Sequence, residues 1–184
     1  MKRPSVAELS AARDRTVPDV IAKDLRVLFV GINPGLYSGA VGHHFARPGN
    51  RFWPTLHRSG FTETLLSPFD EHELARYRLG ITNVVARTTA RADELADDEL
   101  RQGALLLIMK VRKYRPAFVA ILGVTAFRAA FAEPKAVLGL QSRELAGARL
   151  WVLPNPSGLN AHHQLADLAV MFRELRDAAD ARTP

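Results

Sequence analysis

Cysteine is absent from the 184-residue sequence. Its absence excludes disulfide bonds, thiolate catalysis, iron–sulfur clusters and zinc sites built on cysteine. Long apolar runs are also missing, and no stretch of 18 or more apolar residues predicts a membrane-spanning helix. Residues 1–15 lack the apolar core of a secretory signal. We therefore expect a cytoplasmic protein, and the chain length suits one domain.

The charge of the chain is basic and unevenly distributed. Lysine and arginine total 25 against 19 acidic residues, which gives a net charge of +6. The excess lies in two blocks, residues 1–60 with nine basic and four acidic residues and residues 110–149 with eight and two. Such asymmetry favours a polyanionic partner, because lysine and arginine that neutralise phosphates release counterions. Charge alone is equally compatible with a basic enzyme that binds no nucleic acid.

The pattern of apolar residues predicts strands that alternate with helices. Four nearly continuous apolar runs are typical of buried parallel strands, at residues 25–31, 79–85, 117–123 and 149–153. Helices are expected at residues 50–60, 74–78, 93–113, 125–131 and 162–179. The alternation predicts an α/β fold of three layers, with a parallel sheet between helices. We expect residues 1–23 to form a tail or loosely packed helix and residues 24–184 to form a single domain.

The loop after the first predicted strand combines glycine, proline and a polar side chain. It reads Gly31-Ile32-Asn33-Pro34-Gly35 and lies where ligands of such sheets bind, beyond the carboxyl end of a strand. The two glycines allow a ligand to approach the backbone closely, and Asn33 can both donate and accept hydrogen bonds. An Asx-type turn that closes the strand explains the same residues equally well.

The loop after the last predicted strand reads PNPSGLN, residues 154–160. Two prolines stiffen it, and Leu159 lies in its polar tip. An apolar residue in this position either packs back as a hydrophobic staple for the next helix or projects outward. A projecting Leu159 would act as a wedge between DNA bases.

Three motifs together resemble a known family. GINPG (31–35), FARPGNRFW (45–53) and NPSGLN (155–160) are similar to the mismatch-specific uracil-DNA glycosylase and thymine-DNA glycosylase branch of the uracil-DNA glycosylase superfamily. The resemblance extends from about residue 24 to the closing helix. It implies a uracil-DNA glycosylase-like fold with a central four-stranded parallel sheet and helices on both faces. It also implies an enzyme that flips uracil out of double-stranded DNA, especially from G·U mismatches, and hydrolyses its N-glycosidic bond.

The resemblance assigns roles to the first two motifs. Asn33 would hold the attacking water, and Phe45 would stack on the flipped base. Main-chain N–H groups near Ile32 and Phe45 would bind the base oxygens, Ser38 would lie near the C5 edge, and Gly35 would leave room for C5 substituents. Because asparagine is a weak base, the bond must break largely by itself, through an oxocarbenium-like sugar.

The third motif would contact the DNA around the flipped nucleotide. Asn155, Pro156 and Ser157 form its first half, and the resemblance makes Gly158, Leu159 and Asn160 the wedge that fills the vacated gap. Close relatives carry Ser-Arg after the leucine, whereas this chain carries Asn160 followed by alanine. The loss of the arginine removes a strong groove contact and puts selectivity for G·U in question.

The loop after the second predicted strand adds charged candidates. Asp93 would stabilise the cationic sugar or activate water, unless it serves only as a first-turn acid that favours a helix dipole. Arg87 and Arg91 are expected to contact phosphates. The adjacent pairs His43-His44 and His162-His163 lack the spacing of a zinc site, so no metal or other cofactor is expected.

Three functions remain open at this stage. The first is the glycosylase described above, which is expected to act as a monomer. The second is a catalytically weak binding module for mismatched or abasic DNA, because Asn33 stands where a stronger catalyst would carry a carboxylate. The third is a hydrolase of free nucleosides on a similar sheet, which would have no need of Leu159.

Overall fold

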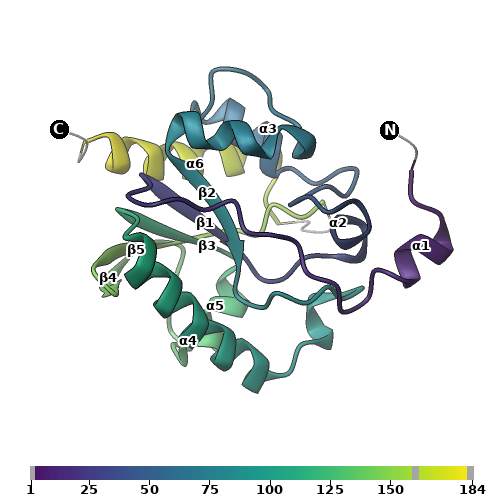
Figure 1. Cartoon of the computed structure of the whole chain (residues 1–184). Helices are drawn as coiled ribbons and strands as arrows, with labels where there is room; N and C mark the ends of the chain where they lie inside the picture. Colours follow the sequence, from purple (N-terminus) through teal and green to yellow (C-terminus); the bar gives the residue numbers. More distant parts are fainter. Residues whose placement is uncertain (1–2, 159–161, 182–184) are drawn as a thin grey trace.

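A computed structural model of the chain, which describes residues 3–158 and 162–181, has a five-stranded sheet at its centre (Figure 1). The strands lie in the order β2-β1-β3-β5-β4. Their bounds are β1 (Val27–Gly31), β2 (Leu79–Asn83), β3 (Phe118–Leu122), β4 (Gly139–Leu145) and β5 (Ala148–Leu153). The four predicted strands are confirmed as β1, β2, β3 and β5, which pair in parallel. Because helices cover both faces of the sheet, nearly all residues of these four strands are buried.

The fifth strand corrects the expectation of four. β4 pairs antiparallel with β5 at the edge of the sheet, with Leu140 opposite Trp151 and Glu144 opposite Arg149. Most of its residues remain exposed or half-buried, and only Leu145 is fully buried. An edge strand of this kind needs no apolar run, so its sequence, GLQSREL, carried no strand signal.

Helices form the two outer layers. On one face, α4 (Asp97–Tyr114) and α5 (Val124–Phe131) cover the sheet; on the other lie α3 (Phe52–Arg58), the 3₁₀ segment η1 (Pro68–Tyr77) and α6 (Leu165–Asp180) (Figure 1). The first core cluster includes Leu28, Val30 and Leu107, and the second centres on Phe29, which contacts Phe52, Phe61 and Phe172. The predicted three-layer architecture is therefore confirmed.

Two elements depart from the predicted helices for local reasons. α4 begins at Asp97 rather than at residue 93, because residues before it form a separate turn, η2 (Ala92–Glu94). Carboxylates define both starts: Glu94 accepts from the Arg91 N–H at 2.8 Å, and Glu99 accepts from the Ala96 N–H at 3.1 Å. The short helix α2 (Leu36–Val41) lies in a segment expected to be a loop, and ends at Gly42, whose φ of 78° is left-handed.

The N-terminal segment lies along the free edge of the second strand, β2. α1 (Val6–Ser10) has no buried residue, whereas Ala12 and Val17 downstream are buried. Val20 exchanges two main-chain hydrogen bonds with Ile81 of β2, at 2.9 and 2.7 Å. Residues 16–20 are thus held against the strand that ends at Asn83. In the described residues, no helix is both long and apolar enough to cross a membrane.

The strand order predicts where a ligand binds. β1 lies between β2 and β3. The connection that leaves β1 passes through α3 on one face of the sheet, and the connection that leaves β3 passes through α5 on the other. Loops that diverge in this way open a crevice beyond the carboxyl ends of the strands. The segments after Gly31, Leu122 and Leu153 border this crevice.

Candidate functional site

A cleft of about 600 Å³ lies at this edge of the sheet. Its volume falls in the range of small-molecule sites. Nine of the residues singled out from the sequence line it: Ile32, Asn33, Gly35, Ser38, Phe45, Arg91, Asp93, Asn155 and Ser157. The turn after β1 and the loop after β5 therefore meet at one site.

The remaining candidates do not line the cleft or cannot be placed. Within the loop after β5, Pro156 is buried and Gly158 is exposed. Leu159 and Asn160 lie outside the described residues. Arg87 points away from the cleft into a network of ion pairs described below.

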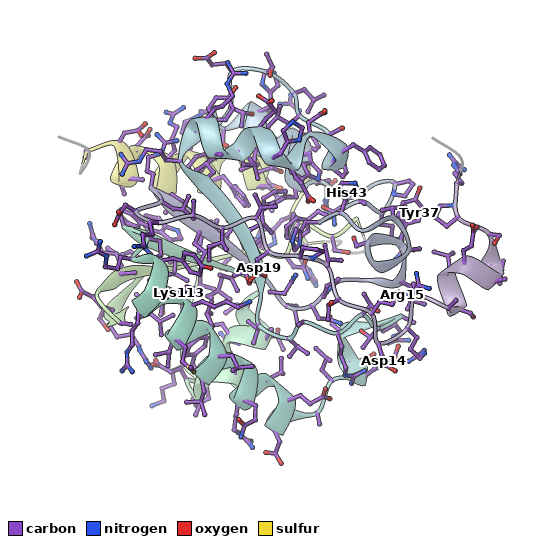
Figure 2. The ribbon with its side chains drawn as sticks, viewed as in Figure 1. Asp14, Arg15, Asp19, Tyr37, His43 and Lys113 are labelled. Atoms are coloured by element: carbon purple, nitrogen blue, oxygen red, sulfur yellow. The ribbon has the colours of Figure 1, made fainter. Side chains whose placement is uncertain are left out.

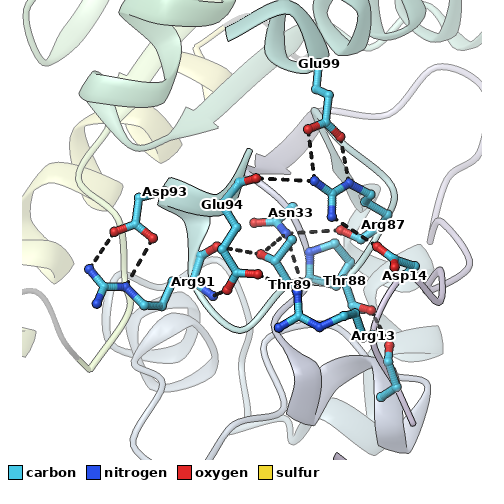
Figure 3. A network of polar contacts seen from close by, with 12 residues as sticks. Arg13, Asp14, Asn33, Arg87, Thr88, Thr89, Arg91, Asp93, Glu94 and Glu99 are labelled. Atoms are coloured by element: carbon cyan, nitrogen blue, oxygen red, sulfur yellow. Dashed lines mark hydrogen bonds and ion pairs between the residues drawn. The ribbon is translucent and has the colours of Figure 1, made fainter. Parts of the chain in front are cut away.

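The side-chain amide of Asn33 is held in one orientation (Figure 3). Its Nδ2 donates to the Thr89 hydroxyl at 2.8 Å, to the Arg87 carbonyl at 3.1 Å and to the Pro34 carbonyl at 3.3 Å. Carbonyl oxygens can only accept, so the NH₂ end must face them. Thr89 donates its own proton to the Arg91 carbonyl at 2.7 Å and therefore accepts from Asn33. This arrangement leaves Oδ1 of Asn33 as an acceptor at the cleft.

Arg87 anchors the loop that holds Asn33 (Figure 3). Its guanidinium binds both carboxylate oxygens of Glu99, at 2.6 and 2.9 Å, and Asp14 at 3.0 Å. A phosphate contact by Arg87 does not fit this placement, because two carboxylates already occupy its donors. Its role is instead to fix the carbonyl that accepts from Asn33.

The Arg87–Glu99 pair makes stability depend on acid pH. Hydrogen bonds from Arg87, and then from the Ala96 N–H, lower the pKa of Glu99 from 4.5 to about 2. Because the folded pKa lies below the unfolded one, the stabilisation is complete above about pH 4.5 and is lost as pH falls towards 2. We expect Glu99→Gln to flatten the dependence of melting temperature on pH in this window. An equally steep acid transition in Glu99→Gln would contradict the role of the pair.

Asp93 lies at the mouth of the cleft beside Arg91. The two side chains form a bidentate ion pair, at 2.5 and 3.1 Å, and both are largely exposed (Figure 3). Glu94, not Asp93, accepts the main-chain hydrogen bond that starts the turn. Asp93 is nevertheless an acidic residue in the first turn of η2, and its carboxylate is paired with Arg91 at the cleft.

Phe45 forms an aromatic wall. Its ring stacks on Phe52 with centroids 4.1 Å apart, and its φ of 52° is left-handed, which is uncommon for a bulky residue. The next residue, Ala46, donates its N–H to the Ser38 hydroxyl at 3.2 Å. Ser38 on α2 thus holds the turn that presents the Phe45 ring.

Asn83 was not among the residues singled out from the sequence, and His44 was considered there only as a metal ligand. Asn83 is the last residue of β2, directly opposite Gly31, and both Asn83 and His44 line the cleft. His44 is 2% exposed and Asn83 is 8% exposed. The sequence did contain a signal for Asn83, because it is a polar residue at the carboxyl end of a buried, largely apolar strand.

The loop after β5 is tied to the Phe45 segment. Arg51 donates its N–H to the Pro156 carbonyl at 2.9 Å and its guanidinium to the His163 carbonyl at 2.5 Å and to the Ser157 carbonyl. A Cβ on Gly158 would lie 2.5 Å from the Gly49 carbonyl oxygen, so the two loops are in close contact. The segments on both sides of residues 159–161 are consequently held against the cleft.

The described basic residues of the two blocks do not gather on one face at the cleft. Arg47, from the first block, is exposed and lines the cleft. α4 ends near the start of β1, where the Asp24 N–H donates to the Tyr114 carbonyl at 2.8 Å. Figure 2 shows Lys113 far from His43 and Tyr37, which belong to the segment bordering the cleft. Basic residues around the end of α4 therefore do not contribute to the charge at the cleft mouth.

The described residues contain no group of three or more histidine, aspartate or glutamate side chains that could hold a metal ion. The charged residues that line the cleft are Arg47, Arg91 and Asp93, together with His44. The other polar side chains that line the cleft are asparagines and hydroxyl residues: Asn33, Asn50, Asn83, Asn155, Ser38, Thr89 and Ser157.

Comparison with known proteins agrees with this architecture. A sequence profile of the Uracil DNA glycosylase superfamily matches residues 18–177. The structure is similar to the solution NMR structure of a proposed uracil DNA glycosylase from Methanosarcina acetivorans, with a TM-score of 0.61 and 17% sequence identity. The match covers 89% of this chain and 98% of the other. At this identity the similarity shows a shared fold.

Proposed function

The chain belongs to the uracil DNA glycosylase superfamily, and on that premise we propose that it removes uracil and related pyrimidines from double-stranded DNA by hydrolysing the N-glycosidic bond. One observation carries the proposal: a fixed amide acceptor, Asn33, and an aromatic wall, Phe45, line the same cleft. Its volume suits a single extruded nucleotide. We further propose that uracil opposite guanine is the preferred substrate.

The base would lie between the Phe45 ring and the turn after β1. Stacking on an aromatic ring replaces part of what the base loses on leaving the helix, about 1–3 kcal/mol per base. Main-chain N–H groups of Ile32 and Phe45 would bind its oxygens, and Asn83, which also lines the cleft, would add a side-chain amide. A Cβ on Gly35 would meet nothing within 4 Å, which supports tolerance of C5 substituents.

Asn33 would position the water rather than deprotonate it. Oδ1 would accept a hydrogen bond from the water and so turn a lone pair of the water towards C1′ of the sugar. Because an amide is a weak base, departure of the base must lead, and the water captures an oxocarbenium-like sugar. The C1′–N bond electrons leave with the base, the water oxygen forms the new C1′–O bond, and the proton that the water loses passes through solvent to the departed base anion.

The cleft supports hydrolysis without strand cleavage. None of the described residues that line it is a lysine, so no amine is available there to attack C1′ and open the sugar. The product is then an abasic site in an intact strand, which alkali cleaves. The loop after β5 would occupy the gap in the helix, with Gly158 at its described end and Leu159 and Asn160 as the proposed wedge.

Asp93 is proposed to assist the developing cation from the cleft mouth. We expect Asp93→Asn to lower the single-turnover excision rate about tenfold, less than a buried acid–base group would, because solvent and Arg91 screen the exposed carboxylate. Asp98→Asn, which alters an exposed carboxylate of α4 that does not line the cleft, is the matched control. Equal rates for Asp93→Asn and wild type would remove Asp93 from the mechanism.

A duplex panel tests the proposed function. Uracil or thymine is placed opposite guanine or adenine, and each duplex is incubated with the protein and treated with alkali. Alkali-dependent scission at uracil, fastest opposite guanine, is the expected result. A retarded but uncut band would instead indicate a binding module for mismatched DNA. Release of uracil from free deoxyuridine, with no action on the duplex, would indicate a nucleoside hydrolase.

A further inference from the structure

His44 lies between the N-terminal segment and Asn83. Its Nε2 is 2.9 Å from the Pro18 carbonyl oxygen, and its Nδ1 is 3.4 Å from Nδ2 of Asn83. Its main-chain N–H donates to Glu71 at 2.9 Å, and its carbonyl accepts from the Trp53 indole at 3.2 Å. The imidazole is therefore held in a fixed place by groups from four segments of the chain.

The chemistry of these partners determines the position of each proton. A carbonyl can only accept, so the proton of the imidazole must be on Nε2. Burial is the main cause that lowers the pKa of His44, against the opposing effects of the Pro18 carbonyl, Glu71 and Asp19, while His43 lowers it further. In the neutral ring, Nδ1 then carries a lone pair. The atom of Asn83 that faces it must be the NH₂ donor.

The other end of the Asn83 amide therefore points into the cleft. A Cβ built on Gly31 would collide with Oδ1 of Asn83 and would lie 3.3 Å from Cζ of Phe45. Oδ1 thus lies over Gly31, next to the aromatic wall against which the base would stack. A base in the cleft meets an acceptor at this point, not a donor.

We propose that His44, oriented by the main-chain carbonyl of Pro18, is a positioning residue that fixes the Asn83 amide so that the cleft selects bases with a hydrogen-bond donor at N3. This inference rests on the proposed function and deepens it. Uracil and thymine carry an N3–H, which pairs with Oδ1. Cytosine has a lone pair at N3, which would face the same oxygen and leave both acceptors unpaired.

The N-terminal segment that supplies Pro18 is itself fixed. Asp19 forms an ion pair with Lys110 at 2.6 Å and accepts from the Thr82 hydroxyl at 2.6 Å. Lys110 also contacts Thr82 at 2.9 Å. Thr82 precedes Asn83 on β2, so the carbonyl that orients His44 and the strand that carries Asn83 belong to one connected network.

Binding of uncleavable DNA measures the selectivity independently of catalysis. Duplexes carrying 2′-fluoro-deoxyuridine or 2′-fluoro-deoxycytidine opposite guanine are titrated against wild type, His44→Phe and His43→Phe. We expect His44→Phe to reduce the preference for the uracil duplex about tenfold, because the Asn83 amide can then turn over. His43→Phe, which changes the neighbouring histidine that contacts Glu71, should keep the wild-type preference. An unchanged preference in a folded His44→Phe protein would overturn the proposal.

A second measurement needs neither catalysis nor a folded His44 variant. ¹⁵N NMR of the free wild-type protein should show the neutral His44 ring protonated on Nε2. Asn83→Asp places an oxygen opposite Nδ1, so the pKa of His44 should rise as the ring gains a proton there. A ring protonated on Nδ1 in wild type, or an unchanged pKa of His44 in Asn83→Asp, would refute the proposal that His44 positions the Asn83 amide. Failure to excise uracil with both NMR results intact would refute only the proposed function.

Discussion

Alanine in place of Asn33 should lower the single-turnover rate of uracil release at least ~100-fold, at the lower end of what a positioned proton-handling group contributes. The variant removes Oδ1, which we propose holds the attacking water, and leaves the aromatic wall and the base-binding groups intact. Affinity for the 2′-fluoro-deoxyuridine duplex should therefore change little. Rapid-quench kinetics on a G·U duplex and an equilibrium titration separate the two effects.

Thr89→Val is the graded control for this prediction. It keeps Oδ1 of Asn33 but removes the nearest of the three acceptors that orient the amide, at 2.8 Å. We expect a smaller loss of rate than in Asn33→Ala, with a similar affinity. If Asn33→Ala weakened binding and left the chemical step unchanged, Asn33 would be a base-binding residue and not a holder of water.

The second large effect is expected from Gly31→Ala. The added methyl group would collide with Oδ1 of Asn83 and press on the tip of Phe45 at 3.3 Å. Displacing a hydrogen-bond acceptor and a stacking surface should lower kcat/KM for uracil roughly 10- to 100-fold, since each contributes about 1–3 kcal/mol. Thermal melting measured alongside separates this loss from unfolding.

A double-mutant cycle identifies the cause of the Gly31→Ala effect. Asn83→Ala removes the atom with which the methyl group collides, so Gly31→Ala should cost much less in that background than in wild type. The two effects would be strongly non-additive. Simple additivity would mean that Gly31→Ala acts through the backbone of β1 and not through Asn83.

The four parallel strands could be predicted from the sequence because a strand that is buried on both faces of the sheet is a nearly continuous run of apolar residues. β1, β2, β3 and β5 are continuous apolar runs, and each was expected within two or three residues of its bounds. β4 was missed because an edge strand that is largely exposed needs no apolar pattern. The start of α4 was misplaced by four residues because Glu94 and Glu99 each accept the main-chain hydrogen bond that begins a separate turn.

Most of the candidate residues were found from short sequence motifs. The structure brings residues of the 31–35 turn and of the 155–157 loop together at the cleft. Arg87 was assigned to phosphate because a sequence cannot show that Glu99 and Asp14 fold back onto it. The relation between Pro18, His44 and Asn83 was equally hidden, because it joins three segments that only the tertiary structure brings together.

The charge pattern was a weaker guide than the motifs. The basic residues near the end of α4 were counted towards a polyanionic partner, yet they lie at the opposite end of the sheet from the cleft. Arg47 and Arg91 are the basic side chains at the cleft itself, apart from histidine, among the residues described. Linear blocks of charge do not predict a binding face because each strand–helix crossover reverses the direction of the chain.

One turnover in ¹⁸O-labelled water tests most directly whether this cleft hydrolyses a flipped nucleotide. The protein is mixed in excess with a G·U duplex, and both products are analysed by mass spectrometry. The mechanism predicts stoichiometric free uracil without label and an abasic sugar that carries one ¹⁸O atom. Duplex that is fully bound but retains its uracil would contradict it.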